Sequence, residues 1–254
     1  MILTDPKDAL HKAMLYRLLI SILDEKNLAL NLYFKGGTCA AMLGWLDRFS
    51  IDLDFDLAVG ADKQKVRSYL TRVFTNTGFT ISQKAKNELY FVLKYPAPTG
   101  QRSSLKLSVV DQKVKTNIYK PHFLAEIERY AVCQSQETMF ANKLVAVTDR
   151  FKKYHTVAGR DVYDIYYFFT QGYRYNGKVI TERTGKTPHA YLKDLAGFIE
   201  KHVTGKGVTE DLSFLLTPAR FRAIRHTLKS EVLLFLKNTP APPTSPPTST
   251  STEK

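Results

Sequence analysis

Cysteine and long apolar runs are both scarce in this chain of 254 residues. Cys39 and Cys133 are the two cysteines, too few for a disulfide framework and without the spacing of metal ligands, so we expect both to be small buried side chains. No apolar stretch reaches membrane-spanning length, and the amphipathic N-terminus lacks an evident cleavage site. We also find no internal repeats. These absences argue against a disulfide scaffold, a membrane protein and a repeat protein, and they favour a cytoplasmic location.

Acidic side chains are in the minority. The chain has 37 Lys and Arg against 24 Asp and Glu, a formal net charge of +13 and an isoelectric point near 9.6. An enzyme this basic commonly meets a polyanion such as a nucleic acid. An acidic partner protein, or non-specific attraction, would use the same surface. The apolar fraction of 44% is that of an ordinary globular protein with a sizeable core.

The hydrophobic pattern changes along the chain from mixed to helical. Before residue 125 it predicts a helix over 6–25, a strand over 28–34, a helix over 38–46, an acidic strand, a helix over 62–75, and three antiparallel strands over 79–82, 89–95 and 105–110. From about residue 135 it predicts helices over 137–151, 160–170, 188–201 and 218–237. The expected fold class is therefore α+β: a sheet domain of α/β type with an N-terminal helix over 1–125, a mainly helical C-terminal domain over 126–238, and a disordered Pro, Thr and Ser tail over 239–254.

The acidic strand carries Asp52, Asp54 and Asp56 on alternate residues. Side chains two apart on a strand project from the same face, so the three carboxylates repel one another and raise one another's pKa values. A divalent cation such as Mg²⁺ reverses that cost, and carboxylate oxygens are ligands that it prefers. The alternate residues Ile51, Leu53, Phe55 and Leu57 form an apolar row suited to a core sheet. The competing interpretation is a solvated edge strand that the aspartates keep soluble.

A glycine pair precedes this strand by about one helix length. Gly36 and Gly37 lie where a buried strand turns into a helix, and there the backbone can approach a ligand closely and helix amides favour an anion. A glycine pair alone usually marks an ordinary turn. Followed by an alternating aspartate pair at this distance, it indicates a phosphate site facing a metal site.

These residues resemble a known family. The pattern GG[ST], a spacer of about a dozen residues and DxD is similar to the nucleotidyltransferase superfamily related to DNA polymerase beta, and the longer form GGT...RFSxDxDFD resembles its AbiEii/AbiGii toxin branch, which includes the MenT-like proteins. A second block is similar to the KLxAL...R...RDxYDL block of that branch; it comprises residues 142–146, Asp149, Arg150 and residues 160–165. The resemblance covers roughly residues 30–170.

The resemblance implies roles for residues of both blocks. It implies catalytic roles for Asp52 and Asp54, which hold Mg²⁺ or Mn²⁺, for Lys143 as a clamp on the NTP triphosphate, and for Asp161 or Asp164, between which the sequence does not choose. It implies nucleotide contacts from Gly36, Gly37, Thr38, Arg48, Ser50 and Lys143. A purely structural interpretation of the second block, in which Arg160, Lys143 and the two aspartates staple neighbouring helices, stays open.

One position departs from the family pattern. Enzymes of this type take a third carboxylate from a later strand, and this chain has Ser108 at that place. The nearest aspartate, Asp111, falls on the opposite face by strand parity. Three explanations stay open: Asp161 or Asp164 supplies the carboxylate, a bulge turns Asp111 round, or part of the chemistry is lost.

Three functional hypotheses follow. The resemblance implies a toxin that transfers NMP from an NTP to an RNA acceptor, in particular a tRNA 3′ end, which blocks translation and which a cognate antitoxin protein neutralises. An antibiotic-type nucleotidyltransferase acting on a small molecule is the alternative, although a cationic acceptor of that kind calls for an acidic pocket and this chain is rich in Lys and Arg. The third hypothesis is a degenerate member that binds a nucleotide or RNA without chemistry, which Ser108 motivates.

Overall fold

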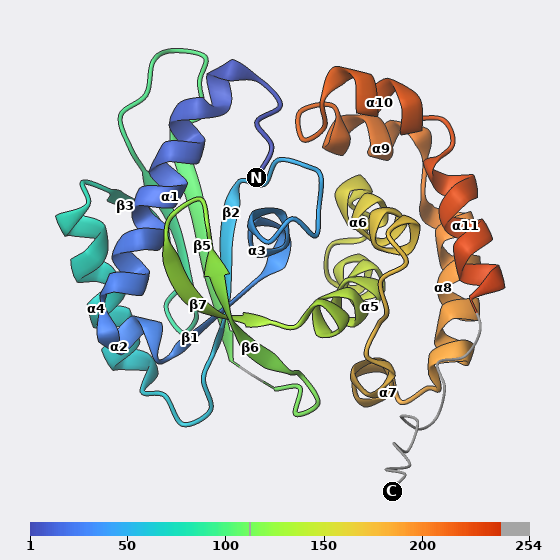
Figure 1. Cartoon of the computed structure of the whole chain (residues 1–254), viewed down its shortest axis with the longest axis horizontal. Helices are drawn as coiled ribbons and strands as arrows, with labels where there is room; N and C mark the ends of the chain where they lie inside the picture. The colour runs from blue at the N-terminus through green and yellow to red at the C-terminus, as the bar shows by residue number, and fades with distance from the viewer. Residues whose placement is uncertain (112, 240–254) are drawn as a thin grey trace, which may run out of the picture.

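The computed structural model describes residues 1–111 and 113–239 (Figure 1). Its elements in chain order are η1 (Pro6–Asp8), α1 (Ala9–Asp24), α2 (Lys26–Ala29), β1 (Leu32–Lys35), α3 (Gly36–Met42), β2 (Asp52–Leu57), α4 (Lys63–Asn76), β3 (Thr80–Lys84), β4 (Leu89–Lys94), β5 (Ser104–Asp111), β6 (Tyr119–Leu124), β7 (Arg129–Gln134), α5 (Gln136–Tyr154), α6 (Gly159–Thr170), α7 (Gly177–Thr184), α8 (Pro188–His202), α9 (Gly205–Leu212), α10 (Pro218–Ile224) and α11 (Leu228–Asn238). The expected α+β class is confirmed.

In the described residues the strands form one mixed sheet of seven in the order β3-β4-β5-β2-β1-β7-β6. The acidic strand β2 lies at its centre, antiparallel to β1 and parallel to β5. A central strand has no free edge, so the interpretation of β2 as a solvated edge strand is wrong. The antiparallel order of β3, β4 and β5 is as expected.

Two strands, β6 and β7, were not expected. They pair with each other, and β7 joins β1 in parallel, so the sheet continues to Gln134 and the boundary expected at 125/126 falls within the β6–β7 hairpin. The sequence did not predict β6 because it contains Pro121, and proline is unfavourable in a central strand. As an edge strand β6 tolerates it.

Several helix boundaries also differ from the periodicity. The chain forms the short helix α2 before β1, since the Glu25 side chain caps Asn27 N, and the strand expected from residue 28 begins only at Leu32. The helix expected over 218–237 divides into α10 and α11. Helix α7 was missed because its β-branched residues resemble a strand; the Asn176 side chain caps it. Of the tail expected over 239–254, Thr239 caps α11 and the rest lies outside the described residues.

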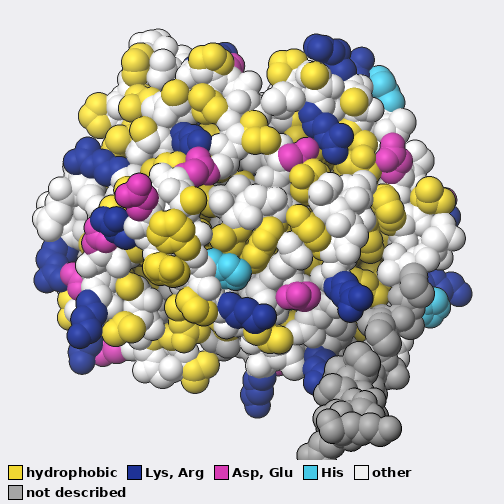
Figure 2. Space-filling model, in the orientation of Figure 1, with side chains coloured by type: hydrophobic (Ala, Val, Ile, Leu, Met, Phe, Trp, Pro, Cys, Tyr) yellow, Lys and Arg dark blue, Asp and Glu magenta, His cyan; other side chains and the backbone are white. Residues whose placement is uncertain are grey.

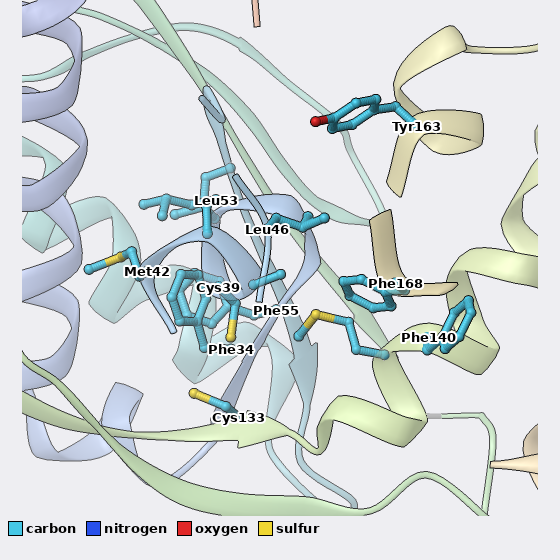
Figure 3. Packing of buried hydrophobic residues seen from close by; sticks show 14 of the residues in the cluster. Phe34, Cys39, Met42, Leu46, Leu53, Phe55, Cys133, Phe140, Tyr163 and Phe168 are labelled. Carbon is cyan, nitrogen blue, oxygen red and sulfur yellow. The ribbon is translucent and has the colours of Figure 1, made fainter. Parts of the chain in front are cut away.

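The helices form two groups around the sheet. In Figure 1, α1, α2 and α4 lie on one side of the sheet, and the helices from α5 onward form a second lobe on the other side. Figure 3 shows the core behind β2, where Phe34, Leu53 and Phe55 pack near Cys39 and Cys133. Both cysteines are buried and unbridged, as expected. Within the described ranges, no helix is both long enough and apolar enough to span a membrane.

Candidate active site

A cavity of about 450 Å³ lies where the central strand β2 faces helices α5 and α6. Most of the residues singled out in the sequence line it: Gly36, Gly37, Arg48, Ser50, Asp52, Asp54, Lys143 and Asp161. Thr38 and Asp164 are buried behind its wall and do not line it. Two sequence blocks, residues 35–56 and 142–165, therefore meet at one cavity although they are far apart in the chain.

The three aspartates of β2 have different surroundings. Asp56 is 4% exposed, and its carboxylate accepts hydrogen bonds from Lys35 Nζ (2.5 Å), Tyr119 Oη (2.8 Å) and Gln134 Nε2 (2.7 Å). The carboxylates of Asp52 and Asp54 have no hydrogen bond or ion pair within residues 1–111 and 113–239. Asp56 is thus committed to the fold, whereas its two neighbours have their oxygens available for a ligand.

The electrostatic setting of Asp54 fits a cation site. Burial in the cavity wall and the charge of Asp52 raise the pKa of Asp54 above its ordinary value, although Lys35, Lys143 and Arg160 act in the opposite direction. On the opposite face of the strand, Leu53 and Phe55 are fully buried. The core therefore fixes β2 while its other face holds two repelling carboxylates.

The glycine turn lies in direct contact with this face. Gly36 has φ +80°, which favours glycine, and a Cβ built on it would lie 2.7 Å from Asp54 Oδ2. A Cβ on Gly37 would lie 2.7 Å from Arg48 Nη2 and 2.9 Å from Ser50 Oγ. Both positions have no room for a side chain, so the turn brings bare backbone to the carboxylate.

Thr38 holds the turn against the strand. Its hydroxyl lies 2.5 Å from the carbonyl oxygen of Asp52, to which it donates, and 2.9 Å from Ser50 Oγ. The side chain is 1% exposed. The structure therefore places Thr38 beneath the expected nucleotide contacts, where it fixes the backbone of Asp52.

A buried ion cluster joins the two lobes. Arg48 donates from Nε (2.5 Å) and Nη2 (2.7 Å) to the two oxygens of Asp164, and Lys143 Nζ donates to Asp164 Oδ2. Burial opposes the charged carboxylate, yet Arg48 and Lys143 together lower the pKa of Asp164 below its ordinary value. Asp164 is fully buried, so it fixes the positions of two cations that line the cavity.

Asp161 occupies the neighbouring turn of α6 and lines the cavity itself. Its carboxylate accepts from Arg150 Nε at 2.7 Å. Arg160 also lines the cavity and has no ion-pair partner in the part of the chain that the structure describes. Helix α6 thus places the side chains of Asp161 and Arg160 in the cavity and the buried carboxylate of Asp164 behind its wall.

The sheet register shows where Ser108 lies, the residue at the place where the family pattern has a third carboxylate. Ser108 pairs with Asp54, and the pairs from Asp52–Lys106 to Leu57–Asp111 run without a bulge. Of the three explanations left open by the sequence, the bulge that would turn Asp111 round is therefore wrong. Asp111 nevertheless reaches the cavity rim at the end of β5, where its carboxylate lies 3.1 Å from Lys63 Nζ. Asp161 and Asp111 are therefore the further carboxylates that line the cavity.

Sequence reasoning missed a chain of hydrogen bonds along the cavity wall. Arg183 Nη1 donates to Asn142 Oδ1 (2.7 Å), Asn142 Nδ2 to Asn117 Oδ1 (3.0 Å), Asn117 Nδ2 to Tyr119 Oη (3.3 Å), and Tyr119 Oη to Asp56. Arginine only donates and carboxylate only accepts, so both amide orientations are fixed. No spacing signal marks Arg183, Asn117 and Tyr119, which lie on an unexpected helix, a loop and an unexpected strand, whereas Asn142 lies on the helix expected over 137–151.

The donor set fits a divalent cation that arrives with its substrate. Among the described residues, no group of three or more His, Cys, Asp or Glu side chains is arranged to hold a metal ion. Mg²⁺, however, commonly binds one or two carboxylates together with substrate phosphates and water. The half-buried, unpaired pair Asp52 and Asp54 beside a bare glycine turn satisfies that requirement.

Comparison with solved structures shows the same fold in bacterial proteins. JHP933 from Helicobacter pylori has a TM-score of 0.56 and 18% identity, covering 93% of this chain and 92% of its own. MenT4, a nucleotidyltransferase toxin from Mycobacterium tuberculosis, has a TM-score of 0.53 and 16% identity, covering 92% of this chain and 85% of its own. No curated protein matches the sequence significantly.

Comparison with protein families gives the assignment. Residues 17–239 match the family described as "Nucleotidyl transferase AbiEii toxin, Type IV TA system". That range contains the glycine turn, the acidic strand and the Arg48–Asp164 cluster, and it spans most of both lobes. The chain therefore belongs to the AbiEii nucleotidyl transferase toxin family and is a nucleotidyltransferase.

Proposed function

We propose that this nucleotidyltransferase moves a nucleoside monophosphate from an NTP to an RNA acceptor, in particular the 3′ end of a tRNA, and so blocks translation in the cytoplasm. The observation that carries the proposal is the pair of unpaired carboxylates, Asp52 and Asp54, facing the cations Lys143 and Arg160 across one cavity. The family's toxin–antitoxin description supports a cognate antitoxin as partner.

Each residue of the cavity has a distinct task in this reaction. Asp52 and Asp54 would hold Mg²⁺, which would neutralise phosphate charge and lower the pKa of the acceptor hydroxyl. Gly36 and Gly37 contact the triphosphate through their backbone, and the absence of a side chain lets this backbone lie against Asp54, Arg48 and Ser50. Lys143, held by Asp164, offsets the negative charge that develops on the leaving pyrophosphate.

The chemistry is an in-line displacement at the α-phosphorus. A bond forms between the acceptor 3′ oxygen and the α-phosphorus, the bond to the bridging oxygen breaks, and pyrophosphate leaves with its electron pair. The acceptor hydroxyl loses its proton. We assign the proton-accepting role to Asp161, because it lines the cavity whereas Asp164 is fully buried between Arg48 and Lys143.

The acceptor class follows from charge. The net charge of +13 favours a polyanion and opposes a cationic aminoglycoside-like acceptor. Figure 2 shows Lys and Arg side chains spread over both lobes of the visible face, with acidic side chains interspersed among them. The cavity itself is lined by seven Lys and Arg side chains and five aspartates, a smaller excess of positive charge than that of the whole chain.

The test is transfer of label from each α-labelled NTP, with Mg²⁺, to total RNA and to purified tRNA. We expect label at tRNA 3′ ends, loss of transfer on chelation of divalent ions, and loss in Asp54→Ala. The control is Asp194→Ala, an exposed aspartate of α8 whose partner is Lys186. Transfer to a small hydroxyl compound but to no RNA would refute the proposed acceptor, and full activity of Asp54→Ala would refute the metal site.

A further inference from the structure

A second, larger groove lies beside the cavity, on the side of α7. It has a volume of about 1540 Å³ and runs between residues 115–120, the start of α5 and the segment from Arg174 to His189. Asn117 lines both this groove and the cavity, so the two are neighbours that share one wall residue.

The walls of the groove are firmly built. The Glu182 carboxylate of α7 accepts hydrogen bonds from the backbone N–H groups of Lys115 (2.7 Å) and Thr116 (2.8 Å) and from the Thr116 hydroxyl (2.7 Å). Asn176 Nδ2 donates to the Thr116 carbonyl oxygen, and Ile118 N donates to Thr138 Oγ1. These bonds use the backbone of the loop and leave its side chains available.

Four cations line this groove and have no ion-pair partner within the described ranges: Lys115, Lys120, Arg174 and Lys178. All four are exposed. Of the two acidic lining residues, Glu182 is already engaged by three hydrogen bonds, the Thr116 hydroxyl foremost, which lower its pKa. The groove thus carries four Lys and Arg side chains against the two carboxylates of Glu137 and Glu182, an excess of positive charge.

The groove also offers apolar surface beside these cations. Ile118 is 48% exposed, and the half-buried side chain of Tyr175 also lines the groove. Single-stranded nucleic acids bind to surfaces that combine cations for the phosphates with apolar and aromatic side chains for the bases. The chemistry of the groove fits that combination.

A third groove, of about 630 Å³ beside α9, adjoins the cavity at Arg150 and Arg160. Two of its three Lys and Arg side chains have an acidic neighbour: Lys206 lies 3.8 Å from Glu210, and Arg150 is paired with Asp161. Asp211 adds a further negative charge, and its carboxylate accepts from Gly159 N. Charge therefore favours the α7 groove over the α9 groove as the path of a polyanion.

We propose that the α7 groove binds the single-stranded backbone of the RNA acceptor next to its reacting 3′ end. The inference rests on the proposed function, because it assigns the route of that reaction's acceptor. An acidic partner protein is the competing occupant. RNA is favoured because the groove adjoins the cavity at Asn117, so a strand bound in the groove would lie next to the proposed reaction site.

The test replaces Lys115, Lys120, Arg174 and Lys178 by glutamine, which leaves every backbone hydrogen bond of the groove wall in place. The matched control is Lys206→Gln with His202→Gln in the α9 groove. Binding of a fluorescent 3′-hydroxyl RNA 12-mer is followed by anisotropy over a range of salt concentrations. Transfer kinetics give KM separately for RNA and for NTP.

Four lost phosphate contacts should reduce the slope of log K against log salt by about 3, since each contact on a single strand contributes about 0.7. At about 0.1 M salt the same slope corresponds to a loss of several hundred-fold at most, and we expect the KM for RNA to rise about 100-fold. The KM for NTP should stay unchanged, and the α9 control should behave as the wild type.

The outcomes separate the two proposals. If the wild type labels RNA and the four-residue variant keeps its RNA KM and salt slope, the groove assignment is overturned and the proposed function stands. If the variant instead loses binding to the antitoxin with an unchanged RNA KM, the groove belongs to an acidic protein and the proposal is overturned. If the wild type labels no RNA, the proposed function itself fails.

Discussion

Replacing Gly36 by alanine tests whether the glycine turn holds the Asp54 carboxylate in place for the proposed reaction. The new Cβ would lie 2.7 Å from Asp54 Oδ2, and reaching an ordinary contact of 3.4 Å requires a displacement of about 0.7 Å. The carboxylate must yield, because β2 is fixed behind by Leu53 and Phe55. A misplacement of about 1 Å at a reacting centre costs on the order of 100-fold in rate.

The cost in stability has two parts. An L-residue in the left-handed region costs about 1–2 kcal/mol, and an Asp54 side chain forced off its rotamer adds about 0.5–1.5 kcal/mol. Gly44→Ala is the matched control, since Gly44 has φ +73° and a Cβ there meets nothing within 4 Å. Each kcal/mol lowers the melting temperature of a domain this size by about 2–4 °C.

The assay combines a thermal melt with the rate of NMP transfer for both variants. We expect both to be destabilised, Gly36→Ala somewhat more than Gly44→Ala. Transfer should fall about 100-fold in Gly36→Ala and stay near the wild-type rate in Gly44→Ala. If Gly36→Ala transfers within about threefold of Gly44→Ala, the contact with Asp54 does not position the carboxylate and the reasoning is refuted.

Three further predictions concern single charges. Asp54→Asn should abolish transfer yet stabilise the metal-free protein at pH 7. Burial and Asp52 raise the pKa of Asp54, so the wild-type folded state loses stability as pH rises through the ordinary aspartate range, and the variant does not. Melts in a chelator from pH 4 to 8 should therefore show a stability difference between the two proteins that grows with pH. Asp164→Asn leaves buried Arg48 uncompensated and should cost about 3–5 kcal/mol in a denaturant titration, with loss of transfer. Asp161→Asn should lower kcat with little change in the midpoint of unfolding, and an equal loss of stability in the two variants would contradict their different roles.

The parts of the site that the sequence predicted are those encoded by short-range patterns. Alternation along residues 52–57 predicted which side chains of β2 would enter the core, and the glycine pair marked the turn now found against Asp54. These features depend on the local periodicity of strand and helix. The separate fate of Asp56 could not be predicted, because Gln134 and Tyr119 lie on strands whose pattern proline and mixed burial conceal.

The second block, which contains Asp161 and Asp164, shows what the sequence could not predict. The sequence placed Asp161 and Asp164 three residues apart on one helix and could not choose between them. The choice depends on what lies opposite each carboxylate, and that is set by how α6 packs on α5 and on the loop before β2. Arg48 stands 116 residues from Asp164 in the chain, so no periodicity connects them.

The bidentate contact between Arg48 and Asp164 has a consequence for the variation that this molecule can accept. Either charge alone in the interior is far more costly than the pair, whereas a well-packed apolar pair of similar volume can be neutral or stabilising. A descendant of this chain that has lost one of the two residues is therefore expected to have replaced the other as well. Along such a lineage Lys143 would lose its ion-pair partner Asp164, and the fold would persist after the transfer activity had been lost.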